Sequence, residues 1–145
     1  MNQIERAKEY AKKYHAHQVD KAGVDYFSGH VVTVAQKVAL GGYSDEYVVV
    51  AFLHDIIEDT SVVFEDIVDV FGEKVAFAVK AMTKQKGEEY SLYLERVTSN
   101  KIASVVKFYD MEHNSDINRL SIVREKDLKR QAKYQHYMLI LAKYL

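Results

Sequence analysis

The chain has 145 residues, of which 48% are hydrophobic and 28% charged, as in an ordinary folded domain and not in a disordered chain. Its 20 basic and 21 acidic residues give a net charge of −1, so nothing indicates a general affinity for nucleic acid or an anionic membrane. Cysteine and proline are both absent, which excludes disulfides and thiolate metal sites and removes the strongest helix breaker.

The N-terminal stretch MNQIERAKEYAKKYH mixes charged and apolar residues and lacks the apolar segment of a secretory signal. The apolar residues recur there at spacings of three and four, which predicts a helix over residues 2–17; they are Ile4, Ala7, Ala11 and Tyr14. No apolar run reaches the roughly 20 residues that span a bilayer, so we expect a cytoplasmic protein without a membrane partner.

A loop is expected over residues 19–29 and a helix over residues 30–40, which two glycines terminate. The next segment, EYVVVAFLHDIIED, covers residues 46–59 and can be capped by Ser44 or Asp45. Its valines also suit a strand, but its length of about 14 residues without a turn signal favours one continuous buried helix.

The second half of the chain is predicted to form further amphipathic helices, at residues 64–71, 73–83, 88–99, 101–113 and 124–145. In the last helix, the apolar residues fall on or near one face; they are Leu128, Ala132, Met138, Leu141 and Leu145. Neither an internal repeat nor a shift in composition marks a boundary between domains. The sequence therefore predicts one all-α domain over residues 1–145.

The segment HDIIEDT, residues 54–60, places an imidazole and three carboxylates beside residues that favour burial. On a helix, Asp55, Glu58 and Asp59 stand at i, i+3 and i+4 and share one face. Acids in the last turn of a helix oppose its dipole at roughly 0.3–1 kcal/mol each, and like charges at this spacing add to that cost. A divalent cation would offset these costs. The alternative is a solvated helix end, where exposed carboxylates cost little.

A metal site needs more ligands than one helical turn supplies. His30 follows a glycine at the start of an apolar helix, and Asp110 follows the apolar run VVKFY, with Asn114 one turn further on. The other candidates outside the acidic segment are His15, His17, His113, His136 and Asp116. Imidazole and carboxylate donors without thiolate suit metals such as Mn²⁺, Fe²⁺ or Zn²⁺.

Taken in chain order, His30, the pair His54-Asp55, and Asp110 resemble the H…HD…D ligand pattern of the HD-domain metal-dependent phosphohydrolases. The match extends to blocks that resemble the RelA/SpoT-type (p)ppGpp hydrolase domain and its small stand-alone versions: HAHQVDKAGVDYFSGH, FLHDIIEDT, FEDIVDVFG, VKAMTK and KFYDMEHNSDINRL. Members of that family remove the 3′-diphosphate from guanosine 3′,5′-bis(diphosphate), which gives GDP or GTP and pyrophosphate.

The resemblance implies a compact, all-helical HD-domain fold and a guanine nucleotide as the substrate. It implies that the four residues of the ligand pattern hold one divalent metal, usually manganese in this family. It also implies that Glu58 and Asp59 act on the attacking water, and that Lys21 and Asn114 contact the nucleotide.

The chain departs from the family pattern around the nucleotide pocket. Val31 stands where the family has the proline after its first ligand, and Asp25 stands where it has the proline before a tyrosine. Met111 and Glu112 follow the last ligand, where the family usually has an arginine. Two alternatives therefore stay open: an HD-domain phosphohydrolase of another nucleotide or phosphate ester, and a helical binding module whose metal site is only structural.

Overall fold

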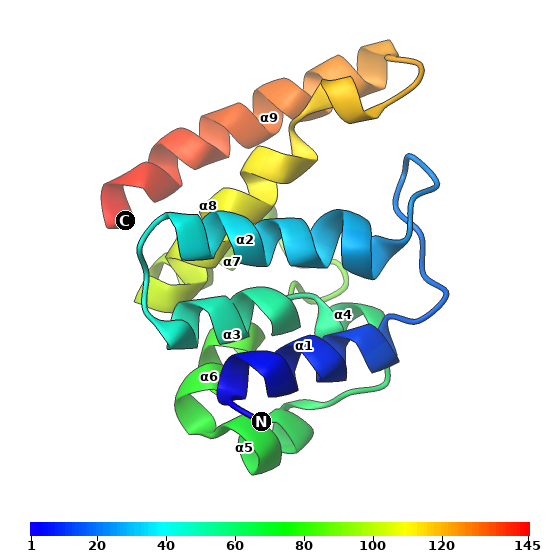
Figure 1. Cartoon of the computed structure of the whole chain (residues 1–145). Coiled ribbons are helices and arrows are strands. Elements are labelled where there is room, and N and C mark those ends of the chain that lie inside the picture. Colours follow the sequence, from blue (N-terminus) through cyan, green and yellow to red (C-terminus); the bar gives the residue numbers. More distant parts are fainter.

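The computed structural model describes residues 1–145 and consists of helices and connecting turns, with one isolated extended bridge between Val19 and Asp25 (Figure 1). The α-helices are α1 (Gln3–Tyr14), α2 (Val32–Leu40), α3 (Asp45–Leu53), α4 (Ile56–Asp59), α5 (Phe64–Phe71), α6 (Glu73–Ala81), α7 (Tyr90–Thr98), α8 (Lys101–Asn114) and α9 (Glu125–Leu141). Shorter helical turns are the π-helical η1 (Phe27–Val31) and the 3₁₀ turns η2 (Ile117–Arg119) and η3 (Ala142–Tyr144). The predicted all-α fold is confirmed.

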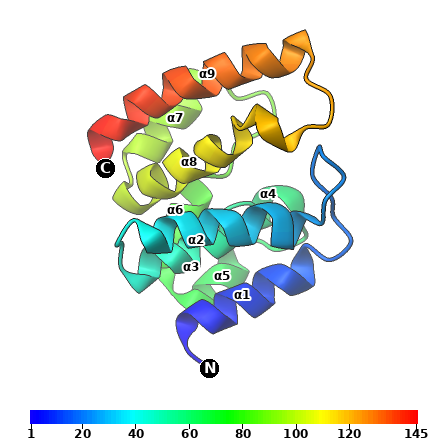
Figure 2. The same ribbon diagram turned by 45° about the horizontal axis from the view of Figure 1, so that its top comes forward.

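Helix α3 lies at the centre of the molecule and packs against α1, α2, α6 and α8. Helix α9 covers α8 at one end of the molecule, while α1 and α5 lie at the other end (Figures 1 and 2). None of the helices combines the length and the apolar character needed to cross a lipid bilayer.

The amino-acid sequence of α3 explains its central position. Six consecutive residues, Val48 to Leu53, are buried. A helix that is apolar on all sides finds its stable place inside a fold, where every face meets another element. The C-terminal end of α3 therefore carries the next residues of the chain, His54 and Asp55, into the interior.

The prediction of one continuous helix over residues 46–59 is wrong, because the chain turns at His54 and Asp55 between α3 and α4. The His54 Nδ1 atom lies 2.6 Å from the carbonyl oxygen of Ala51. In an unbroken helix that oxygen would accept the N–H of Asp55. The imidazole thus takes the place of a backbone donor, and α4 starts anew with Glu58 and Asp59 in its only turn.

Two further expectations need correction. The predicted loop over residues 19–29 ends early, because η1 begins at Phe27 and places His30 inside a helical turn that leads into α2. The predicted apolar face of α9 is buried only in part: Leu141 is fully buried, whereas Leu128 is 49% exposed.

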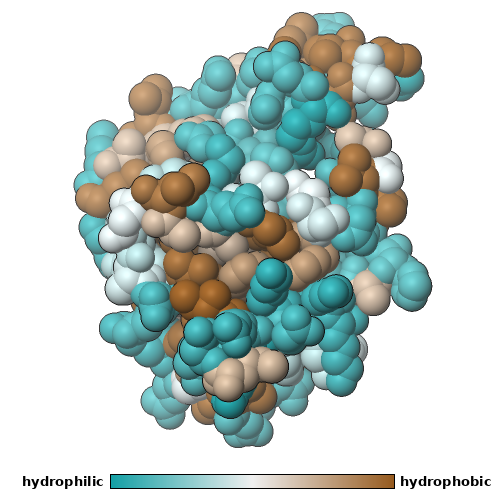
Figure 3. All heavy atoms as spheres, in the orientation of Figure 1, coloured by the Kyte–Doolittle hydropathy of each residue, from teal (hydrophilic) through white to brown (hydrophobic).

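The surface view shows hydrophobic atoms gathered over the middle of one face, among hydrophilic surroundings (Figure 3). A shallow groove between α1, α2 and α3 contains apolar residues of all three helices, among them Ile4, Ala35, Val48 and Phe52. The apolar surface of α3 therefore comes close to solvent here, while the end that bears His54 lies inside.

Replacing a core leucine of α3 tests this arrangement. Leu53→Ala removes a fully buried side chain and is expected to lower the free energy of unfolding by roughly 2–5 kcal/mol, since the cavity adds to the lost burial. Leu139→Ala, at a residue 72% exposed on α9, is the matched control and should change it by less than about 0.5 kcal/mol. Urea denaturation measures both, and equal losses would contradict the central position of α3.

Candidate metal centre

Four side chains from three separate parts of the chain converge at the inner end of α3. His30 comes from η1, His54 and Asp55 come from the turn between α3 and α4, and Asp110 comes from α8. One ligand atom from each residue lies within 4.8 Å of the others. The two histidines and Asp110 are buried, and Asp55 is partly exposed. The structure thus brings together the four residues that the sequence singled out as metal ligands.

The two imidazoles face the two carboxylates at short distances. His30 Nε2 lies 2.8 Å from Asp110 Oδ1, and His54 Nε2 lies 3.0 Å from Asp55 Oδ2 and 3.3 Å from Asp110 Oδ1. The Nε2 atom of His54 is buried and has no hydrogen-bond partner of good geometry.

The tautomer of His54 explains why this centre fits a cation. Its Nδ1 donates a hydrogen to the Ala51 carbonyl, because a carbonyl oxygen can only accept. Nε2 is therefore the ring atom that faces Asp55 and Asp110. Burial opposes a positive charge on His54, but the charges of these two carboxylates raise its pKa well above the usual value. The site thus favours a positive charge beside Nε2, which a proton or a metal ion in its place can supply. Two nitrogen and two oxygen donors of this kind fit a divalent metal ion.

Neighbouring groups hold Asp110 in its ionised form and in its orientation. Lys107 Nζ lies 3.0 Å from one carboxylate oxygen, and the Asn114 amide donates to the other at 3.1 Å. Burial opposes the ionisation of Asp110, but the charges of Lys107 and His54 hold its pKa well below the usual value. Asn114, predicted as a nucleotide contact, thus holds the carboxylate of a predicted metal ligand in place.

A neighbouring histidine also holds the ring of His30 in its orientation. Its Nδ1 lies 2.8 Å from Nδ1 of His113. Burial lowers the pKa of His113 to about 4, and the nearby charge of Arg119 contributes. A neutral His113 can accept the Nδ1 hydrogen of His30, which leaves the Nε2 lone pair of His30 directed at the centre. The remaining candidates lie outside this group of ligand atoms: His15, His17, His136 and Asp116.

The last ligand, Asp55, receives a hydrogen bond from a residue outside the predicted set. The hydroxyl of Tyr26 donates to the Asp55 carboxylate, while the same carboxylate faces His54. Tyr26 stood in the predicted loop beside the altered position Asp25, and its sequence position alone gave no sign of this contact. The tyrosine helps to fix the orientation of this predicted ligand.

Glu58 and Asp59, the predicted catalytic pair, lie on α4 at the rim of the centre and are not among the converging ligand atoms. Glu58 Oε1 accepts the backbone N–H of Lys84 at 2.8 Å, and Asp59 Oδ2 lies 3.5 Å from the Gln18 amide nitrogen. Partial removal from water raises the pKa of both carboxyls, and the charge of Asp55 adds to this. A carboxylate with a raised pKa is a better proton acceptor.

Two cavities meet at the centre. The first, about 180 Å³, is lined by His54, Asp55 and Glu58 together with Met82, Lys84, Tyr90, Tyr93, Lys107 and Tyr134. The second, about 260 Å³, is lined by His30 together with Val19, Asp20, Lys21, Tyr26, Asn114, Arg119, Arg130 and Tyr134. Lys21 and Asn114, both predicted to contact the nucleotide, line the second cavity. Nothing in the sequence indicated that Arg130 and Tyr134 of α9 would line a cavity at the centre, because the resemblance to the family included no motif in this helix.

Several known proteins are similar to this chain in sequence. A sequence model of the HD domain family matches residues 7–107. The guanosine-3′,5′-bis(diphosphate) 3′-pyrophosphohydrolase of Aquifex aeolicus is 33% identical over 139 residues, which cover 90% of this chain and 20% of that protein. A protein of the same name from Spiroplasma citri is 28% identical over 145 residues, which cover 91% of this chain and 19% of that protein. The chain thus spans about a fifth of the length of these curated relatives.

A solved structure shares the fold. It belongs to a metazoan protein described as an ortholog of SpoT that hydrolyzes ppGpp and plays a role in starvation responses. The two structures superpose with a TM-score of 0.79 at 22% sequence identity, over 99% of this chain and 85% of the other. Since the family model also covers most of the sequence, this chain belongs to the HD domain family.

Proposed function

We propose that this protein is a metal-dependent hydrolase that removes the 3′-diphosphate of guanosine 3′,5′-bis(diphosphate), (p)ppGpp, as pyrophosphate. The observation that carries the proposal is the convergence of two histidines and two aspartates beside Glu58, at a cavity that also contains lysines. The names of the relatives from Aquifex aeolicus and Spiroplasma citri support the choice of substrate.

The metal would be held by His30, His54, Asp55 and Asp110, whose donor atoms lie close enough together for one ion. When bound, the ion supplies a Lewis acid that activates water and neutralises phosphate charge. The mixed nitrogen and oxygen donors admit Mn²⁺, Fe²⁺ or Zn²⁺. We choose manganese because of the resemblance of the four-ligand pattern to that of the (p)ppGpp hydrolases.

Glu58 is proposed to take the proton of the attacking water. One of its carboxylate oxygens is held by the Lys84 N–H, so the other oxygen stays free to accept the proton. Its raised pKa brings the carboxylate closer to the basicity that general base catalysis at neutral pH requires. Asp59, at the next position and near the amide of Gln18, would orient the same water.

The lysines of the first cavity are proposed to bind the phosphoryl groups of the 3′-diphosphate. Lys107 and Lys84 line the cavity that also contains Glu58. Burial opposes the charge on Lys107, but the carboxylate of Asp110 raises its pKa well above the usual value, so the amine stays protonated. The nucleoside would then occupy the second cavity, where Tyr26 and Tyr134 offer aromatic surface and Asn114 offers an amide.

One observation favours a different substrate for the same enzyme class. Met111 is buried, and Glu112 pairs with Lys37 at 2.7 Å, so neither residue supplies the positive charge of the arginine that the family usually has there. The second candidate function is therefore hydrolysis of another nucleotide or phosphate ester. A panel of nucleotides separates the two functions: we expect ppGpp to be hydrolysed fastest, and faster hydrolysis of another substrate would favour the second.

Metal binding can be measured without any substrate. Adding Mn²⁺ at about 100 times its dissociation constant should stabilise the fold by about 2.7 kcal/mol, which corresponds to a rise in Tm of roughly 5–10 °C. Asp110→Asn removes a proposed ligand charge and should abolish the rise. Asp69→Asn changes an exposed carboxylate of α5 and should leave it intact. A full rise in Asp110→Asn would contradict the ligand assignment.

The role of Glu58 is tested by Glu58→Gln, which keeps the size of the side chain and removes the proton acceptor. We expect kcat for ppGpp to fall by about 10²–10⁴-fold, while the Tm rise with Mn²⁺ stays, because Glu58 is not a proposed ligand. Glu65→Gln, an exposed change on α5, is the control and should keep full activity. If Glu58→Gln hydrolyses ppGpp with the same kcat as the wild type, the proposed role of Glu58 is wrong.

A further inference from the structure

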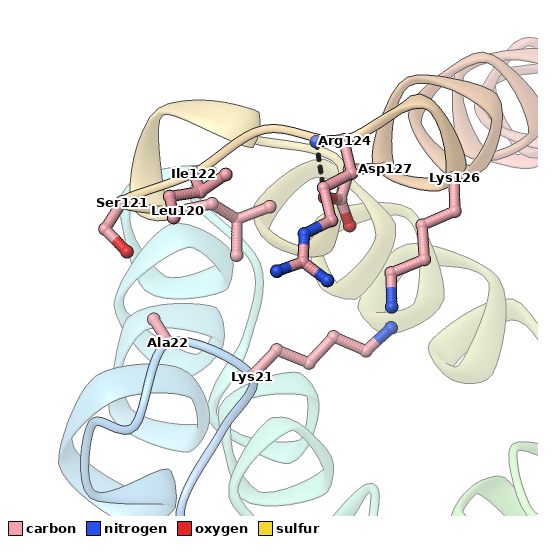
Figure 4. Close-up of a pocket in the computed structure, with 8 residues that line it drawn as sticks. All are labelled: Lys21, Ala22, Leu120, Ser121, Ile122, Arg124, Lys126 and Asp127. Carbon is pink, nitrogen blue, oxygen red and sulfur yellow. Dashed lines mark hydrogen bonds between the residues drawn. The ribbon is translucent and has the colours of Figure 1, made fainter.

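A third cavity, about 450 Å³, lies between the loop at Lys21 and the segment that leads from η2 into α9 (Figure 4). Three of its lining residues are cations, namely Lys21, Arg124 and Lys126. Figure 4 shows their side chains directed into the same space, with the amines of Lys21 and Lys126 facing each other from opposite walls. The other lining residues are Ala22, Leu120, Ser121, Ile122 and Asp127.

The protein itself does not neutralise these three charges. None of them forms an ion pair, although ion pairs lie close by at Arg119 with Asp20 and at Arg130 with Asp127. The one acidic residue of the wall, Asp127, is directed elsewhere: one oxygen accepts the backbone N–H of Arg124 at 3.0 Å, and the other lies 4.0 Å from Arg130. Like charges that share a cavity repel each other, and a bound anion relieves the repulsion.

The three cavities form a series through shared residues. Tyr134 lines both the cavity with Glu58 and the cavity with His30, and Lys21 lines both the cavity with His30 and the cavity with Arg124. A ligand that carries phosphate at both ends could therefore place one end beside the metal centre and the other among the three cations. Guanosine 3′,5′-bis(diphosphate) has this form.

We propose that Lys21, Arg124 and Lys126 bind the 5′-phosphate chain of the nucleotide, at the end remote from the bond that is cleaved. The inference rests on the proposed function and specifies how that site selects its substrate. A net charge of −1 gives the protein no general attraction for polyanions, so a phosphate chain at this end of the nucleotide needs a local cluster of cations such as this one. A partly open cavity of about 450 Å³ suits a short phosphate chain.

Affinity should therefore grow with the number of 5′-phosphates. Because the cations are exposed, each added phosphate is expected to tighten binding by about two- to fivefold at low salt, and less at high salt. A nucleotide with a 5′-triphosphate would then bind more tightly than one with a 5′-diphosphate.

The test measures binding of GMP, GDP and GTP to the full chain by calorimetry, in the absence of metal and at low salt. The affinity of the wild-type protein should rise from GMP to GDP and again from GDP to GTP. The double variant Arg124→Gln/Lys126→Gln should bind the three nucleotides with about equal affinity. Lys143→Gln, which removes one positive charge beyond the far end of α9, is the control and should keep the rise in affinity with each added phosphate. Equal affinities in the wild type, or a rise that persists in the double variant, would overturn the proposal.

Kinetics with ppGpp and pppGpp separate this inference from the proposed function. In the double variant, KM should rise more for pppGpp than for ppGpp. If both substrates are hydrolysed and the variant raises neither KM, the inference fails and the proposed function stands. If neither substrate is hydrolysed although the affinity rises with each added phosphate, the proposed function fails and the phosphate site stands.

Discussion

The architecture of this protein is organised around two carboxylates and two imidazoles that converge in its interior, an arrangement that a bound cation would stabilise. Asp55 and Asp110 face the same two imidazole nitrogens at the inner end of α3. Burial opposes the ionisation of Asp55, but the neighbouring His54 lowers its pKa to about 2. Two carboxylates of this kind beside two imidazole nitrogens are donors that suit a divalent ion.

The apolar helix and the polar centre depend on each other. Because α3 is apolar on every side, it takes the central position and carries the next two residues inward. The bond from His54 to the Ala51 carbonyl then ends the helix and fixes the tautomer that offers Nε2 to the centre. One side chain thus ends the helix and directs one of the predicted ligand atoms at the centre.

The sequence predicted much of this arrangement, and the failures have local causes. Spacing of apolar residues located most helices. The resemblance of His30, His54-Asp55 and Asp110 to the HD-domain ligand pattern selected the residues that converge. The break in the helix escaped prediction because it depends on a bond between a side chain and the backbone, which helical periodicity does not register. The basic cavity escaped because Lys21 and Arg124 lie about a hundred positions apart and meet only in the fold.

The most direct measurement of the central claim is anomalous X-ray diffraction at the manganese absorption edge, from crystals of the protein grown with Mn²⁺. The account predicts one strong peak enclosed by the side chains of His30, His54, Asp55 and Asp110. If crystals grown with saturating Mn²⁺ show no anomalous peak among these four residues, or show one only at another site, the account is contradicted.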